Sequence, residues 1–407
     1  MAAMETDIRA EDRGEAVTLM EPLLLADGYR YRTLITDLAF DLTQKSAGFR
    51  RSLPSSLLTS LADLVRSMNC YYSNLIEGHD THPIEIERAL KNNYSKDTRK
   101  RDLQLEAKAH ITVQKWIDSG SLHGGRAITP EGIREIHRRF CELLPEDLLW
   151  VEEPTTKERL PVVPGELRLR DVKVGRHVAI SPGALPRFLE RFAHVYGKTG
   201  RTESIIATAA AHHRLLWMHP FLDGNGRVAR LMSHAHFLGA LDTGAVWSIA
   251  RGLARNVQEY KMLLANCDNT RRNDLDGRGA LSEEALGDFT QFFLKICIDQ
   301  VTFMERLVQP DRLRARILLW AEEEIRVGEL PPKSGSILEA VLYRGELPRG
   351  DADTVLGTGE RQARRVVSAL IKKGVLVSES QRAPLRLAFP ATLASRWMPG
   401  LFPDRRD

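Results

Sequence analysis

A twelve-residue segment between two helix-forming stretches constrains this chain more than any other part of its sequence. The segment runs from His219 to Arg230 and contains Asp223, two glycines, an asparagine and a second arginine. An apolar stretch over residues 204–218 predicts a helix before it, and helical composition resumes at Val228. Bare glycine N–H groups and the positive end of the second helix would face one point and stabilise an anion there. The segment therefore predicts a phosphate site made of a helix, a loop and a helix.

The side chains of this segment suit chemistry on a phosphate. His219 can take up a proton near neutral pH, and Asp223 is a hard oxygen ligand of the kind that Mg²⁺ prefers. Arg227 and Arg230 are three residues apart, so they share a helical face and can reach outer phosphates. Each residue alone has an ordinary role in a turn or on a solvated face, and it is their combination that favours a function. A dinucleotide fingerprint starting at Gly224 is excluded, because that fingerprint follows a buried strand and here a helix precedes it.

The order of these residues resembles the Fic family signature, H-P-F-x-D/E-G-N-G-R-x-x-R, and every specified position matches. The resemblance implies a nucleotidyltransferase that moves AMP from ATP to a hydroxyl of a target protein, with Mg²⁺ as its metal. By the same resemblance His219 deprotonates the hydroxyl, Asp223 binds Mg²⁺ and Phe221 anchors the loop in the core. The nucleotide-binding residues that it implies are Gly224, Asn225, Gly226, Arg227 and Arg230.

A second short pattern lies far upstream of this loop. Ser73 and Glu77 are four residues apart near the end of a predicted helix, so they project from one face, and Gly78 follows as a C-cap. The pattern resembles S/T-x-x-x-E-G/N, the inhibitory motif of Fic proteins. That resemblance implies that Glu77 pairs with Arg230, occupies the place of the γ-phosphate and keeps the enzyme autoinhibited. The alternative is an ordinary helix surface, on which this spacing is common.

Between Pro161 and Pro182 the apolar residues alternate with charged ones, which predicts a short β-hairpin that turns at Gly175. The P-G-E-x-R segment that opens it resembles the flap of Fic proteins, which binds a target segment by strand addition. The target-binding residues implied by this resemblance are Val172, Val174, Gly175 and His177. A structural hairpin that covers the helices is the alternative.

The sequence after Asp311 predicts a different unit, with two helices, a glycine turn, a basic helix from Glu360 and two strands near residues 375–378 and 385–389. This order resembles a winged helix-turn-helix domain. Its basic helix presents Arg361, Gln362, Arg364 and Arg365. These side chains would contact DNA if they face a major groove, or form the solvated face of a docking or dimerisation module. DNA and a second copy of the chain are therefore both open as partners, besides the target protein.

Length and composition limit the number of domains and the class of protein. The 407 residues predict several domains, which we place at residues 1–105 with the inhibitory helix, 106–305 as the Fic catalytic core and 306–407 as the winged-helix unit. Residues 1–30 are charged, and we expect a flexible arm without a functional role. The net charge of +4 does not by itself indicate a nucleic-acid-binding protein.

The four cysteines show no metal-binding spacing and predict free thiols in a reducing cytoplasm. The sequence shows neither a signal peptide nor a long apolar run, so we expect a cytoplasmic protein without contact to a membrane.

The predicted fold is mainly α, a Fic-type helical bundle with a β-hairpin flap and a small C-terminal winged helix-turn-helix domain. The predicted function is protein adenylyl transfer to a Ser, Thr or Tyr hydroxyl, autoinhibited by Glu77. Two other functions stay open at this point. The first is removal of AMP from a modified protein, with Glu77 aligning a water, and the second is a transcriptional regulator that senses a nucleotide.

Overall fold

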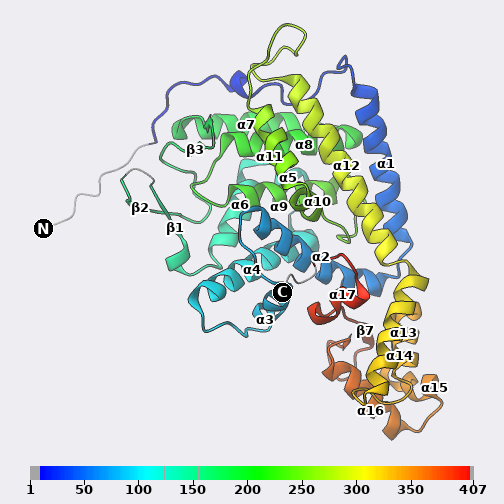
Figure 1. Ribbon diagram of the computed structural model, residues 1–407. Helices are drawn as coiled ribbons and strands as arrows, with labels where there is room; N and C mark the ends of the chain where they lie inside the picture. The colour runs from blue at the N-terminus through cyan, green and yellow to red at the C-terminus, as the bar shows by residue number, and fades with distance from the viewer. Residues whose placement is uncertain (1–9, 123, 154–155, 404–407) are drawn as a thin grey trace, which may run out of the picture.

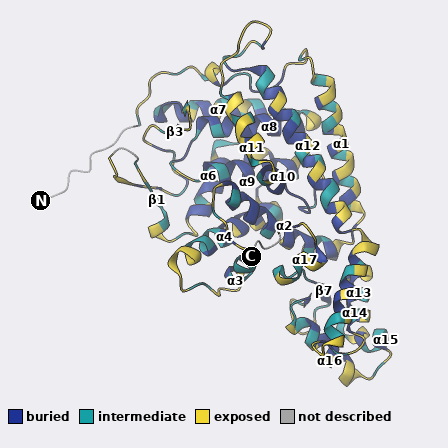
Figure 2. Ribbon diagram, viewed as in Figure 1, coloured by how far each residue is buried: buried dark blue, intermediate teal, exposed yellow. Residues whose placement is uncertain are grey.

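Helices form most of the chain, and two long ones run side by side along one edge (Figure 1). The computed structural model describes residues 10–122, 124–153 and 156–403. Helix α1 (Arg32–Arg51) packs against α12 (Glu283–Leu307), and both contact α8 (Arg201–Met218). Figure 2 shows the buried residues concentrated where these helices meet. The prediction of a mainly helical fold is confirmed.

The other helices that precede residue 308 complete this helical body. They are α2 (Ser55–Ile76), α3 (Pro83–Leu90), α4 (Thr98–Trp116), α5 (Gly124–Ala127), α6 (Pro130–Cys141), α7 (Leu185–Tyr196), α9 (Asn225–Ala240), α10 (Ala250–Arg255) and α11 (Val257–Cys267). Short turns of tighter or wider helix are η1 (Val17–Met20), η2 (Ile117–Ser121), η3 (Glu146–Leu148) and η4 (Pro182–Ala184). The predicted boundary at 105/106 falls inside α4, and the one at 305/306 falls in the last turn of α12.

Local sequence explains where these helices begin and end. Helix α6 begins after Thr129, whose Oγ1 accepts a hydrogen bond from Gly132 N at 3.1 Å, and Pro130 occupies its first position. Helix α8 ends at Met218, and the capping residue His219 has a left-handed backbone with φ 48° and ψ 62°. This position after a helix is usually taken by glycine. The predicted site histidine therefore lies at the residue where the helix stops.

Two short hairpins lie beside the helical body. They are β1 (Trp150–Glu152) with β2 (Arg159–Pro161), and β3 (Lys173–Val174) with β4 (His177–Val178), both antiparallel. The predicted turn at Gly175 is confirmed, with φ 60°, but the ladder around it is only two residues long on each side. The β1–β2 hairpin was not predicted, because strands of three residues are too short to show an alternating pattern.

The prediction of a flexible N-terminal arm is wrong for residues 10–30. Met20, Leu23 and Leu25 are buried, Met20 completely, and Tyr196 Oη of α7 donates a hydrogen bond to Leu23 O at 2.9 Å. Asp12, Glu15 and Glu21 are paired with arginines, as in the 2.8 Å contact between Arg187 Nη2 and Asp12 Oδ1. The arm is thus a strap across the helical body, held by buried apolar residues and by ion pairs.

The C-terminal unit follows α12 and extends away from its end (Figure 1). Its elements are α13 (Pro310–Arg326), α14 (Ser334–Arg344), β5 (Glu346–Leu347), η5 (Arg349–Asp351), α15 (Ala352–Leu356), α16 (Glu360–Lys372), β6 (Leu376–Val377), β7 (Leu385–Leu387), η6 (Ala391–Leu393) and α17 (Ala394–Trp397). The three strands form one antiparallel sheet with β7 in the centre. The helices and strands expected here are confirmed, and the winged helix-turn-helix assignment stays a prediction.

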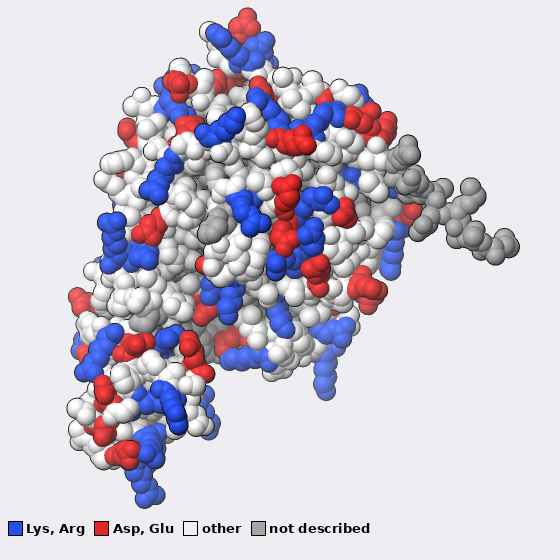
Figure 3. Space-filling view, turned by 180° about the vertical axis from the view of Figure 1, so that it is seen from behind, with Lys and Arg blue, Asp and Glu red and all other residues white. Residues whose placement is uncertain are grey.

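The side chains of Arg361, Gln362, Arg364 and Arg365 are all exposed on α16. Exposure agrees both with a DNA-binding face and with a solvated docking face, so both stay predictions. Figure 3 shows acidic side chains among the basic ones over the visible face of the molecule. Arg364 Nη2 donates a hydrogen bond to Glu360 Oε1 at 2.7 Å.

The residues after β7 return to the helical body and pack on α2. Tyr72 Oη donates a buried hydrogen bond to Leu401 O at 2.9 Å, and the Tyr71 and Phe402 rings meet edge to face with centroids 5.6 Å apart. The buried Trp397 packs on Trp320 of α13, with ring centroids 5.2 Å apart. This segment therefore ties α2 to the C-terminal unit.

All four cysteines are buried free thiols, as expected, and burial raises the pKa of each. Among the helices of the described ranges, none has the length and apolar character needed to cross a bilayer.

Replacing Tyr72 by Phe should lower the free energy of unfolding by about 1 kcal/mol, the usual net contribution of an intramolecular hydrogen bond. Denaturant unfolding followed by circular dichroism measures the change. Tyr343→Phe is the matched control, because Tyr343 is 52% exposed. Equal midpoints for the two variants would show that the contact between α2 and Leu401 adds no stability.

Candidate active site

The predicted loop lines a pocket of about 250 Å³ where α8, α9 and the end of α2 meet. Its lining residues are Glu77, His79, His219, Asp223, Gly224, Asn225, Gly226 and Arg227. The fold thus brings Glu77 to the loop although the two are far apart in the sequence. Ser73 and Arg230 are buried beside this lining.

The loop is closed by Asn225, whose carboxamide bonds to both backbone groups of Phe221. Its Oδ1 accepts from Phe221 N at 3.0 Å, and its Nδ2 donates to Phe221 O at 2.8 Å. Phe221 is fully buried and stacks on His137 of α6 with ring centroids 3.9 Å apart, which confirms its predicted role as an anchor. The observed role of Asn225 is to shape the loop, and its contact with a nucleotide stays a prediction.

His137 was not found from the sequence. Its Nδ1 accepts a hydrogen bond from Gly165 N at 2.9 Å, so the ring joins the loop to the segment that leads into the flap. The amphipathic pattern of α6 places His137 among buried residues, but nothing in that pattern indicates that it stacks on Phe221.

The loop turns into α9 through Gly224, which is left-handed with φ 79°. The first N–H groups of α9 have no partner within their helix and carry the positive end of its dipole. A side chain at Gly226 would place its Cβ only 2.2 Å from Glu77 Oε1. The Glu77 carboxylate therefore lies directly against this end of α9, where an anion is stabilised.

The predicted pair between Glu77 and Arg230 is confirmed, with 2.5 Å between Oε1 and Nη2. Arg230 also donates from Nε to Ser73 Oγ at 2.8 Å and from Nη2 to Ser73 O at 3.2 Å. Burial disfavours the charged form of Glu77, but the Arg230 guanidinium outweighs it and lowers the pKa of that carboxyl. Glu77 is therefore an anion at neutral pH, already bound where the loop attracts anions.

Arg227 belongs to a second cluster that the sequence did not reveal. Its Nη2 donates to Glu106 Oε2 of α4 at 2.8 Å, and His79 Nδ1 lies 2.8 Å from the same oxygen. The hydrogen bond to Glu106 raises the pKa of His79. Glu106 belongs to a helix of mixed charge in which nothing distinguishes it, so only the packing of α4 identifies its role.

His219 is half-buried at the wall of the pocket. Burial penalises its charged form and lowers the pKa of the imidazole to about 4. A neutral ring keeps one nitrogen free to accept a proton at neutral pH. Its position and protonation state both suit a general base.

Asp223 is exposed at the same wall. Within residues 10–122, 124–153 and 156–403, no group of three or more His, Cys, Asp or Glu side chains is arranged to hold a metal ion. One carboxylate is nevertheless enough for Mg²⁺, which keeps several waters and takes its other ligands from substrate phosphates. The donor set therefore fits a metal that arrives with a nucleotide.

The predicted flap residues lie outside the lining of this pocket. Val174 is 47% exposed and Gly175 is exposed at the tip, while Val172 is half-buried. His177 turns inward, with Nε2 2.7 Å from Trp217 O near the end of α8. The hairpin is thus fixed close to His219, and target binding by these residues stays a prediction.

Part of the chain matches a known protein family. Residues 127–237 match the Fic/DOC family model. Two curated relatives are named protein adenylyltransferase Fic. The one from Drosophila grimshawi is 29% identical over 172 residues, 42% of this chain and 32% of the relative, and the one from Drosophila ananassae is 27% identical over 204 residues, 48% and 38%. The chain therefore spans about a third of the length of these relatives.

Two solved structures share the fold. A Fic family protein from Desulfovibrio desulfuricans superimposes with a TM-score of 0.52 at 16% identity, covering 88% of this chain and 97% of its own. Fic-1 from C. elegans gives 0.50 at 16% identity, covering 67% and 72%. The helical body thus has the Fic fold, and the chain is a Fic-domain protein.

The ring of His219 should titrate with a pKa near 4, well below the ordinary histidine value of 6.5, because burial opposes its charge. NMR titration measures this pKa, and the His219 signal is assigned by its absence in His219→Ala. The native ring then stays neutral as the pH falls from 6.5 toward 4, whereas the unfolded chain binds a proton there. His219 should therefore make the folded protein less stable as the pH falls through this window. A midpoint at or above 6.5 would show that burial does not control the charge of this ring.

Proposed function

We propose that this protein is an adenylyltransferase that transfers AMP from ATP to a Ser, Thr or Tyr hydroxyl of a target protein. The observation that carries the proposal is one pocket in which a neutral His219, an exposed Asp223 and the glycine-flanked start of α9 meet. The names of the curated relatives support the same activity.

The proposed reaction follows from the positions of these groups. The imidazole of His219 takes the proton of the target hydroxyl, and the hydroxyl oxygen forms a bond to the α-phosphorus. The bond from that phosphorus to the oxygen bridging it to the β-phosphorus then breaks, and pyrophosphate leaves. The N–H groups at the start of α9 and the guanidinium of Arg227 stabilise the phosphate charge. Asp223 would hold Mg²⁺, which neutralises further phosphate charge when bound.

In this proposal the β3–β4 hairpin holds the target segment, and Glu77 keeps the resting enzyme silent. Glu77 and the γ-phosphate would compete for Arg230 and for the space against Gly226. The support for this is physical, because two anions cannot occupy one anion site at the same time. Release of Glu77 frees both the guanidinium and the volume.

In the Glu77→Gly background, where transfer is measurable, replacing His219 by Ala should reduce AMP transfer about a hundredfold or more, the usual contribution of a positioned general base. Labelling of proteins in a lysate with ATP labelled on the α-phosphate measures the transfer, and ATP binding is measured separately and should persist. His194→Ala is the control, since His194 is exposed on α7. Near-normal labelling by His219→Ala would contradict the proposed role.

The same assay separates the two other functions. Loss of label from a modified protein, without net labelling, would instead indicate removal of AMP. A DNA gel shift that depends on residues 306–407 would instead indicate a nucleotide-sensing regulator.

Replacing Glu77 by Gly should increase labelling. A charge-assisted contact is worth about 1.5–3 kcal/mol, which corresponds to about a ten- to hundredfold change. Glu77→Gln is the matched variant that removes the charge and keeps the bulk. In an Arg230→Ala background the Glu77 substitution should have little further effect, because the two residues act through one contact. Equal or lower labelling by a folded Glu77→Gly protein would refute autoinhibition and leave the catalytic proposal intact.

A further inference from the structure

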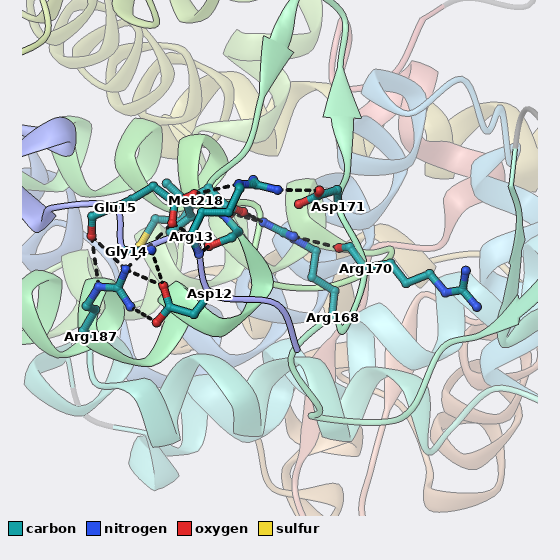
Figure 4. Close-up of polar contacts among 11 residues, drawn as sticks. Asp12, Arg13, Gly14, Glu15, Arg168, Arg170, Asp171, Arg187 and Met218 are labelled. Carbon is teal, nitrogen blue, oxygen red and sulfur yellow. Dashed lines mark hydrogen bonds and ion pairs between the residues drawn. The ribbon is translucent and has the colours of Figure 1, made fainter. Parts of the chain in front are cut away.

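Arg168, the last residue of the P-G-E-x-R segment, is buried directly behind the end of α8. The residue is 3% exposed, and its side chain points from the segment that leads into the β3–β4 hairpin toward Met218 at the end of α8 (Figure 4). The guanidinium donates hydrogen bonds to carbonyl oxygens of His219 at 2.8 Å, Arg170 at 2.8 Å, Ile180 at 2.5 Å and Met218 at 3.4 Å. One side chain thus joins both arms of the flap to the residue proposed as general base.

The backbone of Arg168 adds one more hydrogen bond to the same loop. Its N–H donates to Pro220 O at 3.0 Å, so the carbonyls of Met218, His219 and Pro220 all accept bonds from this one residue. Carbonyls at the end of a helix lack partners within the helix and carry the negative end of its dipole. A buried cation is therefore well placed at this helix end.

The charge of Arg168 is compensated by carbonyl groups. Within the described part of the chain, no carboxylate lies within ion-pair distance of Arg168. Burial lowers the pKa of its guanidinium to about 10. It remains a cation at neutral pH. A phosphate is not expected to bind it, since its donors are used by carbonyls and it is absent from the lining of the 250 Å³ pocket.

The flap around Arg168 is fixed from the other side by the N-terminal strap (Figure 4). Arg13 Nη1 contacts Asp171 Oδ2 at 2.6 Å, and Glu15 accepts from Ser181 N at 2.8 Å and from Ser181 Oγ at 2.5 Å. Both carbonyl acceptors on the flap, at Arg170 and Ile180, are next to these anchored residues. Arg168 therefore links the end of α8 to a hairpin that the N-terminal strap holds in place.

We propose that Arg168 is a positioning residue for the transfer reaction, because it holds the left-handed backbone of His219 and so aims the imidazole into the pocket. The inference rests on the proposed function, in which His219 is the general base. Arg168 also acts through charge. Burial is the main reason that the pKa of His219 is low, and the nearby guanidinium lowers it further. The hydrogen bonds of Arg168 thus fix the backbone that carries the ring, and its charge helps to keep the ring neutral.

The test compares Arg168→Lys and Arg168→Met, each in the Glu77→Gly background so that transfer is measurable. Arg170→Lys is the control, because that side chain is exposed and its backbone carbonyl is retained. We expect kcat to fall about ten- to hundredfold in both Arg168 variants, since a small misplacement of a catalytic group has effects of that size. The KM for ATP should stay within about twofold, because Arg168 does not line the nucleotide pocket.

The pKa of His219, measured by NMR, gives a readout that a merely structural role would not move. It should rise from about 4 in Arg168→Met and rise less in Arg168→Lys, which keeps the charge but cannot bond all the carbonyls. If Arg168→Met does not fold, Arg168→Lys still tests the orientation of the His219 imidazole through kcat and through the chemical shifts of that residue.

A folded Arg168→Lys protein with the kcat and His219 shifts of the Arg170→Lys control would overturn the inference. The inference would also be overturned if the fall in kcat of the Arg168 variants were matched by an equal rise in their KM for ATP. If even the parent protein transfers no AMP, the proposed function fails, and the His219 shifts still report whether Arg168 holds the ring.

Discussion

The abrupt end of α8 at His219 is the constraint on which the rest of the site depends. A helix that stops leaves carbonyl groups without partners, and here the chain must also reverse within a few residues to start α9. The Asn225 carboxamide forms hydrogen bonds with the backbone N–H and carbonyl of Phe221. Arg168 donates a hydrogen bond to the carbonyl of His219. Because both ends are fixed, the start of α9 and the ring of His219 face the same pocket.

Three buried arginines surround this loop, and each is neutralised in a different way. Arg168 bonds to carbonyls, Arg227 to Glu106, and Arg230 to Glu77 and Ser73. A buried cation without partners is costly, so each set of partners offsets the cost of burying its arginine. Only a carboxylate on a movable side chain can be exchanged for an incoming anion. Glu77 meets this condition, because about a third of its side chain is exposed, whereas the carbonyls around Arg168 belong to the backbone.

The sequence predicted what lies close together along the chain. The residues from His219 to Arg230 are adjacent, so their chemical types are themselves the signal, and helical spacing was enough to join Ser73 with Glu77. The roles of Arg168, His137 and Glu106 could not be predicted, because each depends on a contact between segments that only the packed structure brings together.

The same reason explains the wrong prediction for the N-terminal arm. Its acidic residues look solvated until the arginines of α7 are placed against them. The hairpin was predicted at the correct turn, but its ladder is short. Beside it, the carbonyls of Arg170 and Ile180 accept hydrogen bonds from Arg168, and Ser181 N donates to Glu15 of the strap.

The contact between Tyr72 and Leu401 joins residues that a ribosome makes at very different times. Domains generally fold as they emerge, with N-terminal parts first. The loop from His219 to Arg230 is synthesised well before residue 401, so α2 gains its contact with Leu401 only after this loop has been made. During synthesis the helix that carries Ser73 and leads to Glu77 therefore passes through a stage in which it can meet Arg230 but lacks its support from Leu401 and Phe402.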